Sequence, residues 1–268
     1  MRNKADRDIA RNIAIHDRIA RKYEARHGEI FNEVEQGRLH AVLAAARDSV
    51  RTGSRPLRAF DFGCGSGNLT GHLLALGLEV TAADVSSRFL DLVRSRYPQA
   101  ATLLMNGRDL SNVPDASFDL VATYSVLHHV PNYLAAVREM ARICKTGGVI
   151  SIDHEQNEHF WNDDPLYDRF RGEALRFDWR KYLRPMNYLH RIWRMFDPKH
   201  ATEGDVHVWR DDHIEWDQIR RTLLDAGFEI LLEEDYLLYQ QLYRRDVYDR
   251  YVDRCADTKV MHFRKCAA

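Results

Sequence analysis

The stretch FDFGCGSGN, residues 60–68, decides the fold of this chain. It follows an apolar segment over residues 57–62 and precedes a helical pattern that begins near Asn68. This order predicts a strand, a tight glycine turn and the N-terminus of a helix. Glycines at 63, 65 and 67 allow the backbone to turn sharply and allow a ligand to touch the main chain. The helix would direct unpaired N–H groups at that ligand.

A second apolar segment, residues 79–83, ends at Asp84. An acid at the tip of the second strand is placed to accept hydrogen bonds from ribose hydroxyls. A dinucleotide site would show the spacing G-x-G-x-x-G, whereas the spacing here is G-x-G-x-G and Asp61 precedes the first glycine. A carboxylate at that point repels a pyrophosphate and suits a cationic ammonium group. The pattern therefore disfavours a dinucleotide oxidoreductase.

Further motifs follow in a fixed order. They are MNGRDL at 105–110 after a third apolar run, VPDASFDLV at 113–121, YSVLHHV at 124–130, and residues 142–152 with the turn KTGG. Together with residues 60–68 they resemble the class I S-adenosylmethionine-dependent methyltransferases, tightly over residues 55–155 and loosely over 214–234.

The resemblance implies an α/β fold, a Rossmann-like, doubly wound, seven-stranded sheet with an antiparallel last strand. Strands that alternate with helices up to Asp153 favour a parallel sheet on their own. We expect a single methyltransferase domain over residues 1–268. Its parts are an N-terminal helical cap (1–54), a cofactor-binding core (55–155), an aromatic-rich lid insertion (156–210) and the C-terminal part of the core (211–268).

The resemblance also implies which residues bind S-adenosylmethionine. The methionine part is expected at Asp61 and the glycine turn, the ribose at Asp84, and the adenine at Asp109 and Leu110. Tyr23 resembles a tyrosine on a helix that related enzymes fold over the cofactor, although a tyrosine on an apolar helical stripe is also a typical core residue. The full expected set is Asp61, Gly63, Gly65, Gly67, Asp84, Val85, Asp109, Leu110, Tyr124 and Tyr23.

The composition limits the class of protein. The chain has 268 residues, 45% hydrophobic and 29% charged, with a formal net charge of −1. This is an ordinary globular balance without a basic field for nucleic acid. No apolar run is long enough to cross a bilayer, and no apolar signal segment opens the chain. The four cysteines form no C-x-x-C, which favours free thiols in a reducing cytoplasm. The expected partner is a small-molecule acceptor, and a homodimer is left open.

Two groups of titratable residues follow predicted strands. Asp153, His154 and Glu155 follow the fifth strand, and His128 and His129 follow the fourth. Methyl transfer to a hydroxyl needs a group that removes the proton. His154 is our first choice, with Asp153 and Glu155 to orient it, and His129 and His128 come next. As alternatives, Asp153, His154 and Glu155 bind Mg²⁺, or one histidine of the pair packs inward and fixes the loop.

The aromatic content of residues 156–210 suggests the kind of acceptor. All five tryptophans lie between Trp161 and Trp216. They form either a lid over a ring-bearing substrate or the small core of an inserted helical subdomain. We expect O-methylation of a hydroxyl on a sugar or natural product. The alternatives are carbon methylation of a quinone-like or lipid acceptor and, from another class, a regulatory subunit that binds S-adenosylmethionine without turnover.

Overall fold

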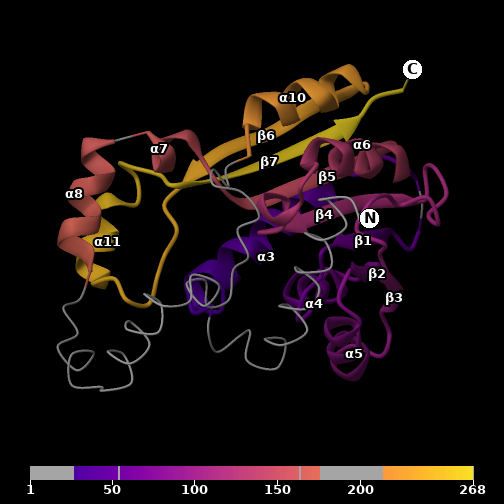
Figure 1. The fold of residues 1–268 in the computed structure, drawn as a ribbon, viewed down its shortest axis with the longest axis horizontal. Coiled ribbons are helices and arrows are strands. Elements are labelled where there is room, and N and C mark those ends of the chain that lie inside the picture. Colours follow the sequence, from indigo (N-terminus) through magenta and orange to yellow (C-terminus); the bar gives the residue numbers. More distant parts are fainter. Residues whose placement is uncertain (1–26, 54, 163, 176–213, 268) are drawn as a thin grey trace, which may run out of the picture.

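The computed structural model describes residues 27–53, 55–162, 164–175 and 214–267. A seven-stranded sheet with the strand order β3-β2-β1-β4-β5-β7-β6 forms its centre (Figure 1). The strands are β1 (Arg58–Phe62), β2 (Glu79–Asp84), β3 (Ala101–Leu104), β4 (Phe118–Tyr124), β5 (Cys144–Gln156), β6 (Phe228–Tyr236) and β7 (Thr258–Lys265).

The sheet is parallel from β1 to β5, and β7 runs antiparallel to both β5 and β6. The predicted fold class is therefore confirmed, including the antiparallel last strand. The strand order reverses between β1 and β4, and in sheets of this kind ligands bind beyond the carboxyl ends of the strands at that reversal. β4 is buried along its whole length, as expected for a central strand covered on both faces.

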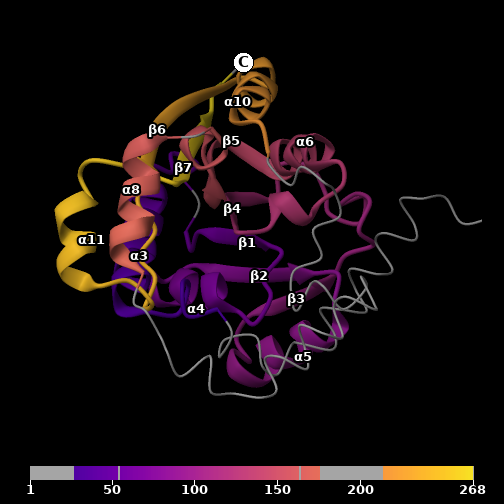
Figure 2. The ribbon, with the colours of Figure 1, turned by 60° about the vertical axis from the view of Figure 1, so that its left-hand side comes forward.

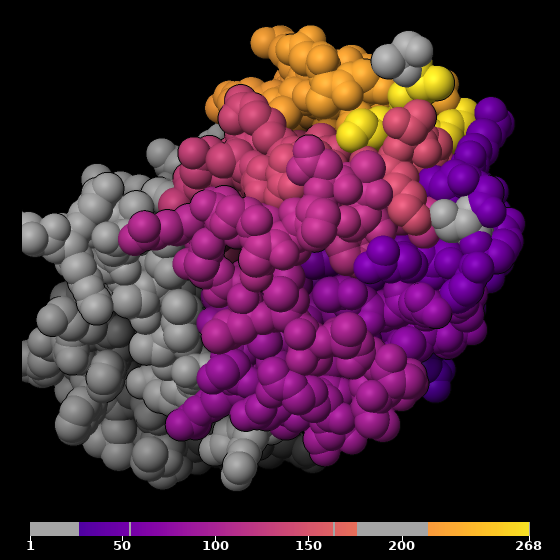
Figure 3. All heavy atoms as spheres, turned by 90° about the vertical axis from the view of Figure 1, so that its right-hand side faces the viewer, coloured from indigo at the N-terminus to yellow at the C-terminus, as the bar shows by residue number. Residues whose placement is uncertain are grey.

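Helices cover both faces of the sheet (Figure 2). They are α3 (Glu33–Asp48), α4 (Asn68–Ala75), α5 (Ser87–Arg96), α6 (Tyr133–Ile143), α7 (Glu158–Trp161), α8 (Pro165–Ala174), α10 (Trp216–Asp225) and α11 (Arg245–Tyr251). Residues of α3 and α4 pack with Ala59 and Leu120, whereas residues of α6 and α10 pack with Phe60 and Val121. Neighbouring residues of one strand thus serve opposite cores, because side chains alternate across a strand. In the face that Figure 3 shows, orange atoms of the segment that holds α10 lie at the top, and purple and magenta atoms of the N-terminal half of the core lie below them.

Two of the segments predicted from sequence fall partly outside the described residues. The described part of the predicted N-terminal helical cap contains α3, and Leu39 and Leu43 are buried on that helix. Residues 1–26, which include Tyr23, and most of the 156–210 insertion lie outside the described part. Where the insertion is described, α8 packs on α11 in a separate aromatic cluster around Phe170 and Tyr251. The described part of the insertion therefore packs on the C-terminal segment that holds α11.

Two smaller findings bear on the sequence-based expectations. The four cysteines are unpaired thiols. Among the described residues, no helix combines the length and the apolar character that a membrane crossing requires.

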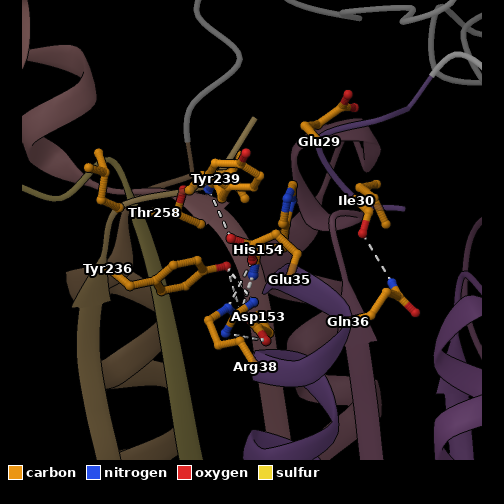
Figure 4. A network of polar contacts seen from close by, with 12 residues as sticks. Glu29, Ile30, Glu35, Gln36, Arg38, Asp153, His154, Tyr236, Tyr239 and Thr258 are labelled. Atoms are coloured by element: carbon orange, nitrogen blue, oxygen red, sulfur yellow. Dashed lines mark hydrogen bonds and ion pairs between the residues drawn. The ribbon is translucent and has the colours of Figure 1, made fainter. Parts of the chain in front are cut away.

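Helix α3 is fixed to the sheet by a buried ion pair (Figure 4). Arg38 donates from Nη1 to Asp153 Oδ2 at 3.1 Å and from Nη2 to Oδ1 at 3.3 Å. The Tyr236 hydroxyl also donates to Oδ1 of Asp153, at 3.0 Å. Burial alone would lower the pKa of the Arg38 guanidinium, yet the Asp153 carboxylate raises it above its ordinary value. Burial raises the pKa of the Asp153 carboxyl, and Arg38 and Tyr236 act against that rise. The pair joins α3, β5 and β6.

We expect Asp153→Ala to lower the free energy of unfolding by about 1–3 kcal/mol, because the partly buried Arg38 would be left with Glu35 as its carboxylate partner and the Tyr236 hydroxyl would lose its acceptor. Urea denaturation measures this change. Asp91→Ala is the matched control, since Asp91 forms a surface pair with Arg94 and its side chain is 71% exposed; the control should lose at most about 1 kcal/mol. Equal losses in the two variants would contradict the structural role of the Arg38–Asp153 pair.

Candidate active site

The glycine turn after β1 is shaped by two neighbouring segments. Gly63 and Cys64 donate their N–H groups to the carbonyl of Ala83 at 2.9 Å, which joins the turn to β2. Gly63 has φ +76°, and a Cβ on it would lie 2.6 Å from the methyl groups of Val126. Gly67, the residue before α4, has φ +92°. Only glycine meets both demands at position 63, the left-handed backbone and the close approach.

A cavity of about 320 Å³ opens beside this turn. Its wall comes from the carboxyl ends of β1, β2 and β4, from the loop after β3 and from α6. The sequence-predicted residues Asp61, Gly63, Gly65, Asp84, Val85, Asp109, Leu110 and Tyr124 all line it. The buried atoms Ser66 Oγ and Asn68 Nδ2, on two further lining residues, have no hydrogen-bond partner within the described part of the chain. Unpaired polar atoms at a helix N-terminus suit a polar ligand, so the cavity fits the expected cofactor.

Asp61 lies buried at the base of the turn. Its Oδ2 accepts a hydrogen bond of 2.6 Å from the Thr70 hydroxyl. Burial raises the pKa of the Asp61 carboxyl to about 7, even though the Thr70 hydrogen bond acts in the opposite direction. A carboxyl in this state gains most from a cationic partner, because the cation stabilises the ionised form.

Asp84 holds the turn as well as facing the cavity. Its Oδ2 accepts from the N–H of Gly65 at 2.9 Å, and its Oδ1 accepts from the N–H of Ser86 at 2.8 Å. A carboxylate has about four lone-pair positions, and each of these backbone bonds occupies one on its oxygen. The predicted ribose contact is thus compatible with a second, structural role.

The loop after β3 differs from the sequence-based picture. Oδ1 of Asp109 already accepts three hydrogen bonds within its own turn, one from Asn106 and two from Ser111. These bonds, those from Ser111 first, lower the pKa of Asp109 to about 2. The N–H of Leu110 donates to Glu139 Oε2 at 2.9 Å. The Asp109 carboxylate and the Leu110 N–H, which were predicted to contact adenine, therefore have protein partners in this structure. Glu139, which also lines the cavity, was not identified from the sequence.

A second cavity, of about 210 Å³, adjoins the first. Ile30, Ser125 and His129 line both cavities. The remaining wall residues are His27, Glu29, His128, His154, Glu155, Gln156, Phe160, Tyr167, Ile214, Leu238, Gln240, Asp257 and Thr258. Phe160 and Tyr167 belong to the described part of the predicted lid, whereas Trp161 is 40% exposed and lines neither cavity. Because the two cavities share a rim, the second is the candidate acceptor site.

Glu155 organises the loop between the two cavities. Its Oε1 accepts from the N–H groups of Val126 at 2.9 Å and Leu127 at 2.7 Å. Its Oε2 lies 2.7 Å from His128 Nδ1. A carboxylate on Nδ1 fixes the tautomer, so that Nε2 is the basic atom of the ring. The geometry thus makes His128, rather than His154, the imidazole with an orienting carboxylate.

Asp153, His154 and Glu155 lie within β5, near its carboxyl end, rather than after it, and they point to different places. Asp153 turns to Arg38, and Glu155 turns to His128. His154 has φ +61°, and its ring lies against Tyr124 with the ring centres 4.6 Å apart. Burial first, then the charges of Arg38, His128 and His27, lower the pKa of His154 to about 3. An imidazole with this pKa stays neutral at physiological pH and is a weak base.

The Mg²⁺ interpretation gains no ligand set from this geometry. Within residues 27–53, 55–162, 164–175 and 214–267, no group of three or more His, Cys, Asp or Glu side chains is placed to bind a metal ion. Asp153, His154 and Glu155 do not converge, because the left-handed backbone at His154 separates their directions.

Four of the cavity residues gave no usable signal in the sequence. They reach the wall from three segments: His27 and Glu29 precede α3, Gln240 follows β6, and Asp257 precedes β7. None belongs to a motif, so only the folded topology brings the three segments together.

The chain is similar to known methyltransferases in sequence and in fold. Residues 60–152 match the family model described as a methyltransferase domain. Over 120 residues the chain is 31% identical to a ubiquinone biosynthesis O-methyltransferase of Xanthomonas campestris pv. campestris. The aligned region covers 42% of this chain and 50% of that protein. The chain thus spans about half the length of the curated relatives it matches.

Solved structures show the same fold at low sequence identity. A SAM-dependent methyltransferase from Methanosarcina mazei has a TM-score of 0.55 and 19% identity, covering 83% of this chain and 97% of that one. The cyclase SpnF has a TM-score of 0.53 and 17% identity, covering 86% and 81%. The matched domain, the glycine turn and the shared fold support a class I S-adenosylmethionine-dependent methyltransferase. The reaction that it carries out has to be argued from its own residues.

We expect cofactor affinity to rise with pH through about 7, because Asp61 must be ionised to pair with the cofactor's ammonium group. The rise should end near pH 8, where an α-amino group loses its proton. Calorimetric titration with S-adenosylhomocysteine measures the profile. Asp61→Asn should flatten it, and Asp109→Asn should keep it, because the pKa of Asp109 is already about 2. Parallel profiles in wild type and Asp61→Asn would remove Asp61 from the methionine site.

We expect Asp84→Ala to weaken binding of S-adenosylhomocysteine by about 1–3 kcal/mol, through lost hydrogen bonds to the ribose and to Gly65. Asp109→Ala should cost less, since Oδ1 of Asp109 serves its own turn. The same calorimetry compares the two variants. A larger loss for Asp109→Ala than for Asp84→Ala would instead support the sequence-based adenine contact.

Proposed function

We propose that this protein transfers the methyl group of S-adenosylmethionine to a hydroxyl of a small molecule held in the 210 Å³ cavity. The observation that carries the proposal is the His128–Glu155 pair, which lies on the wall of that cavity and on the loop that borders the cofactor cavity. The printed name of the Xanthomonas relative, an O-methyltransferase, supports the same kind of acceptor atom.

The proposed chemistry assigns one task to each group. The sulfonium of the bound cofactor supplies an activated methyl group. His128 Nε2 takes the proton of the acceptor hydroxyl, and Glu155 stabilises the resulting imidazolium through Nδ1. The acceptor oxygen then bonds to the methyl carbon as the carbon–sulfur bond breaks, and that electron pair stays on sulfur. Asp61 and the glycine turn hold the methionine part and so fix the line of attack.

The alternatives from the sequence are weaker under this geometry. A quinone-like or lipid acceptor would favour an apolar wall, whereas the candidate acceptor cavity combines imidazoles, carboxylates and amides with apolar and aromatic side chains such as Ile214, Leu238 and Phe160. A sugar or a hydroxylated natural product suits these groups better. A regulatory subunit without turnover would have no need of a base oriented by a buried carboxylate beside the cofactor.

The test is a comparison of base variants at matched cofactor saturation. His128→Ala should lower kcat by about two to four orders of magnitude, since it removes the proton acceptor, and should leave S-adenosylhomocysteine affinity unchanged. Glu155→Gln should lower kcat by less. Release of S-adenosylhomocysteine from S-adenosylmethionine, with hydroxylated sugars and phenols as acceptors, is the measurement.

The outcomes separate the candidate roles. Full activity in His128→Ala together with loss in His154→Ala would return the base to His154. Cofactor binding without release of S-adenosylhomocysteine in the presence of any acceptor would favour a binding subunit.

A further inference from the structure

The wall of the acceptor cavity has an unusual charge balance. Three carboxylates line it, Glu29, Glu155 and Asp257, and no Lys or Arg is among its described lining residues. An anionic acceptor would lose its hydration there without gaining a counter-charge. Carboxylates and phosphates are therefore poor occupants of this site.

The same carboxylates already have partners. Glu29 Oε1 lies 2.7 Å from His27 Nδ1. Asp257 accepts from the N–H of Leu238 at 2.8 Å and from the hydroxyls of Thr258 and Tyr167, each at 2.9 Å. Glu155 is bound to the 126–128 loop, so all three carboxylates have hydrogen-bond partners within the protein. A cationic acceptor would have to compete with these partners. The wall is thus arranged for an uncharged ligand.

A buried nitrogen of His154 on this wall lacks a partner. His154 Nε2 is enclosed and makes no hydrogen bond with any described residue. In a neutral imidazole, Nε2 accepts a hydrogen bond when Nδ1 carries the proton. The residue's N–H donates to Asp153 Oδ1 at 2.6 Å, and Asp153 is held by Arg38. Figure 4 shows His154 directly beside this network.

A buried acceptor without a partner is costly, and it is commonly satisfied by a ligand or by ordered water. His128 and His154 both line this cavity. One wall thus carries two imidazoles with different surroundings. His128 is the base with a carboxylate behind it, and His154 is a neutral acceptor in a fixed orientation.

We propose that the cavity takes an uncharged ring with two neighbouring hydroxyl groups: one gives its proton to His128 and is methylated, and the other donates a hydrogen bond to Nε2 of His154. The inference rests on the proposed function and names its substrate class. Aromatic and saturated rings share this chemistry, so both are included in the test.

The test measures binding to the full chain saturated with S-adenosylhomocysteine, by ligand-observed NMR. The aromatic probes are catechol, phenol and 3,4-dihydroxybenzoate. The saturated probes are cis-1,2-cyclohexanediol, cyclohexanol and 3,4-dihydroxycyclohexanecarboxylate. In at least one series, we expect the diol to bind about tenfold more tightly than its single-hydroxyl partner, and the carboxylate to bind more weakly than the diol. The series that shows the preference identifies the ring type.

His154→Asn removes the acceptor nitrogen, and asparagine tolerates the left-handed backbone at this position. This variant should bring the diol preference close to one. His159→Asn is the matched control, because His159 is exposed and lines neither cavity; it should keep the preference. Unchanged circular dichroism and S-adenosylhomocysteine affinity verify the fold of both.

The inference is overturned if neither diol is preferred in the wild type, if the preference persists in His154→Asn, or if a carboxylate binds most tightly. Methyl transfer is assayed separately. Diol binding that depends on His154, without methyl transfer, would reject the proposed function and uphold the cavity assignment. Methyl transfer without a diol preference would do the reverse.

Discussion

The arrangement of the site depends on the carboxylate of Glu155. It accepts the N–H groups of Val126 and Leu127 and faces Nδ1 of His128, so it fixes the loop that follows β4. The same loop carries the Val126 side chain that packs against Gly63. The Glu155 side chain thereby fixes the orientation of His128 and the position of Val126 beside the glycine turn. Because the carboxylate satisfies two backbone donors, its removal would leave them unpaired in a buried place.

A second network stabilises the other side of the acceptor cavity. Glu35 accepts from Arg38 Nε and from the N–H of Tyr239, while the rest of the Arg38 guanidinium meets Asp153. The helix α3 is therefore joined to β5 and to the segment after β6. These contacts hold His154 from behind, and they explain how a residue with φ +61° keeps one orientation.

The fold and the cofactor turn could be predicted from the sequence because their signals are local. The glycines, Asp61 and Asp84 lie within 25 residues of one another, on two strands that pair. The roles of Asp153, His154 and Glu155, near the carboxyl end of β5, could not be predicted in this way. Asp153 pairs with Arg38, 115 residues away, and Glu155 pairs with His128. The backbone turn at His154 directs Asp153 to Arg38 and Glu155 to His128. The residue sequence carries no clear signal of that turn. Tyr23 lies outside the described residues, so its predicted role stays a prediction.

The rim shared by the two cavities has a consequence for how this protein can diverge. Ile30, Ser125 and His129 face both ligands, so a change at any of them alters the cofactor site together with the acceptor site. The outer wall of the candidate acceptor cavity lines that cavity alone; its residues are Gln156, Phe160, Tyr167, Leu238, Gln240, Asp257 and Thr258. New acceptor preferences are therefore most accessible through substitutions in these outer segments, which leave methyl-donor recognition intact, and libraries for altered substrate range are best directed there.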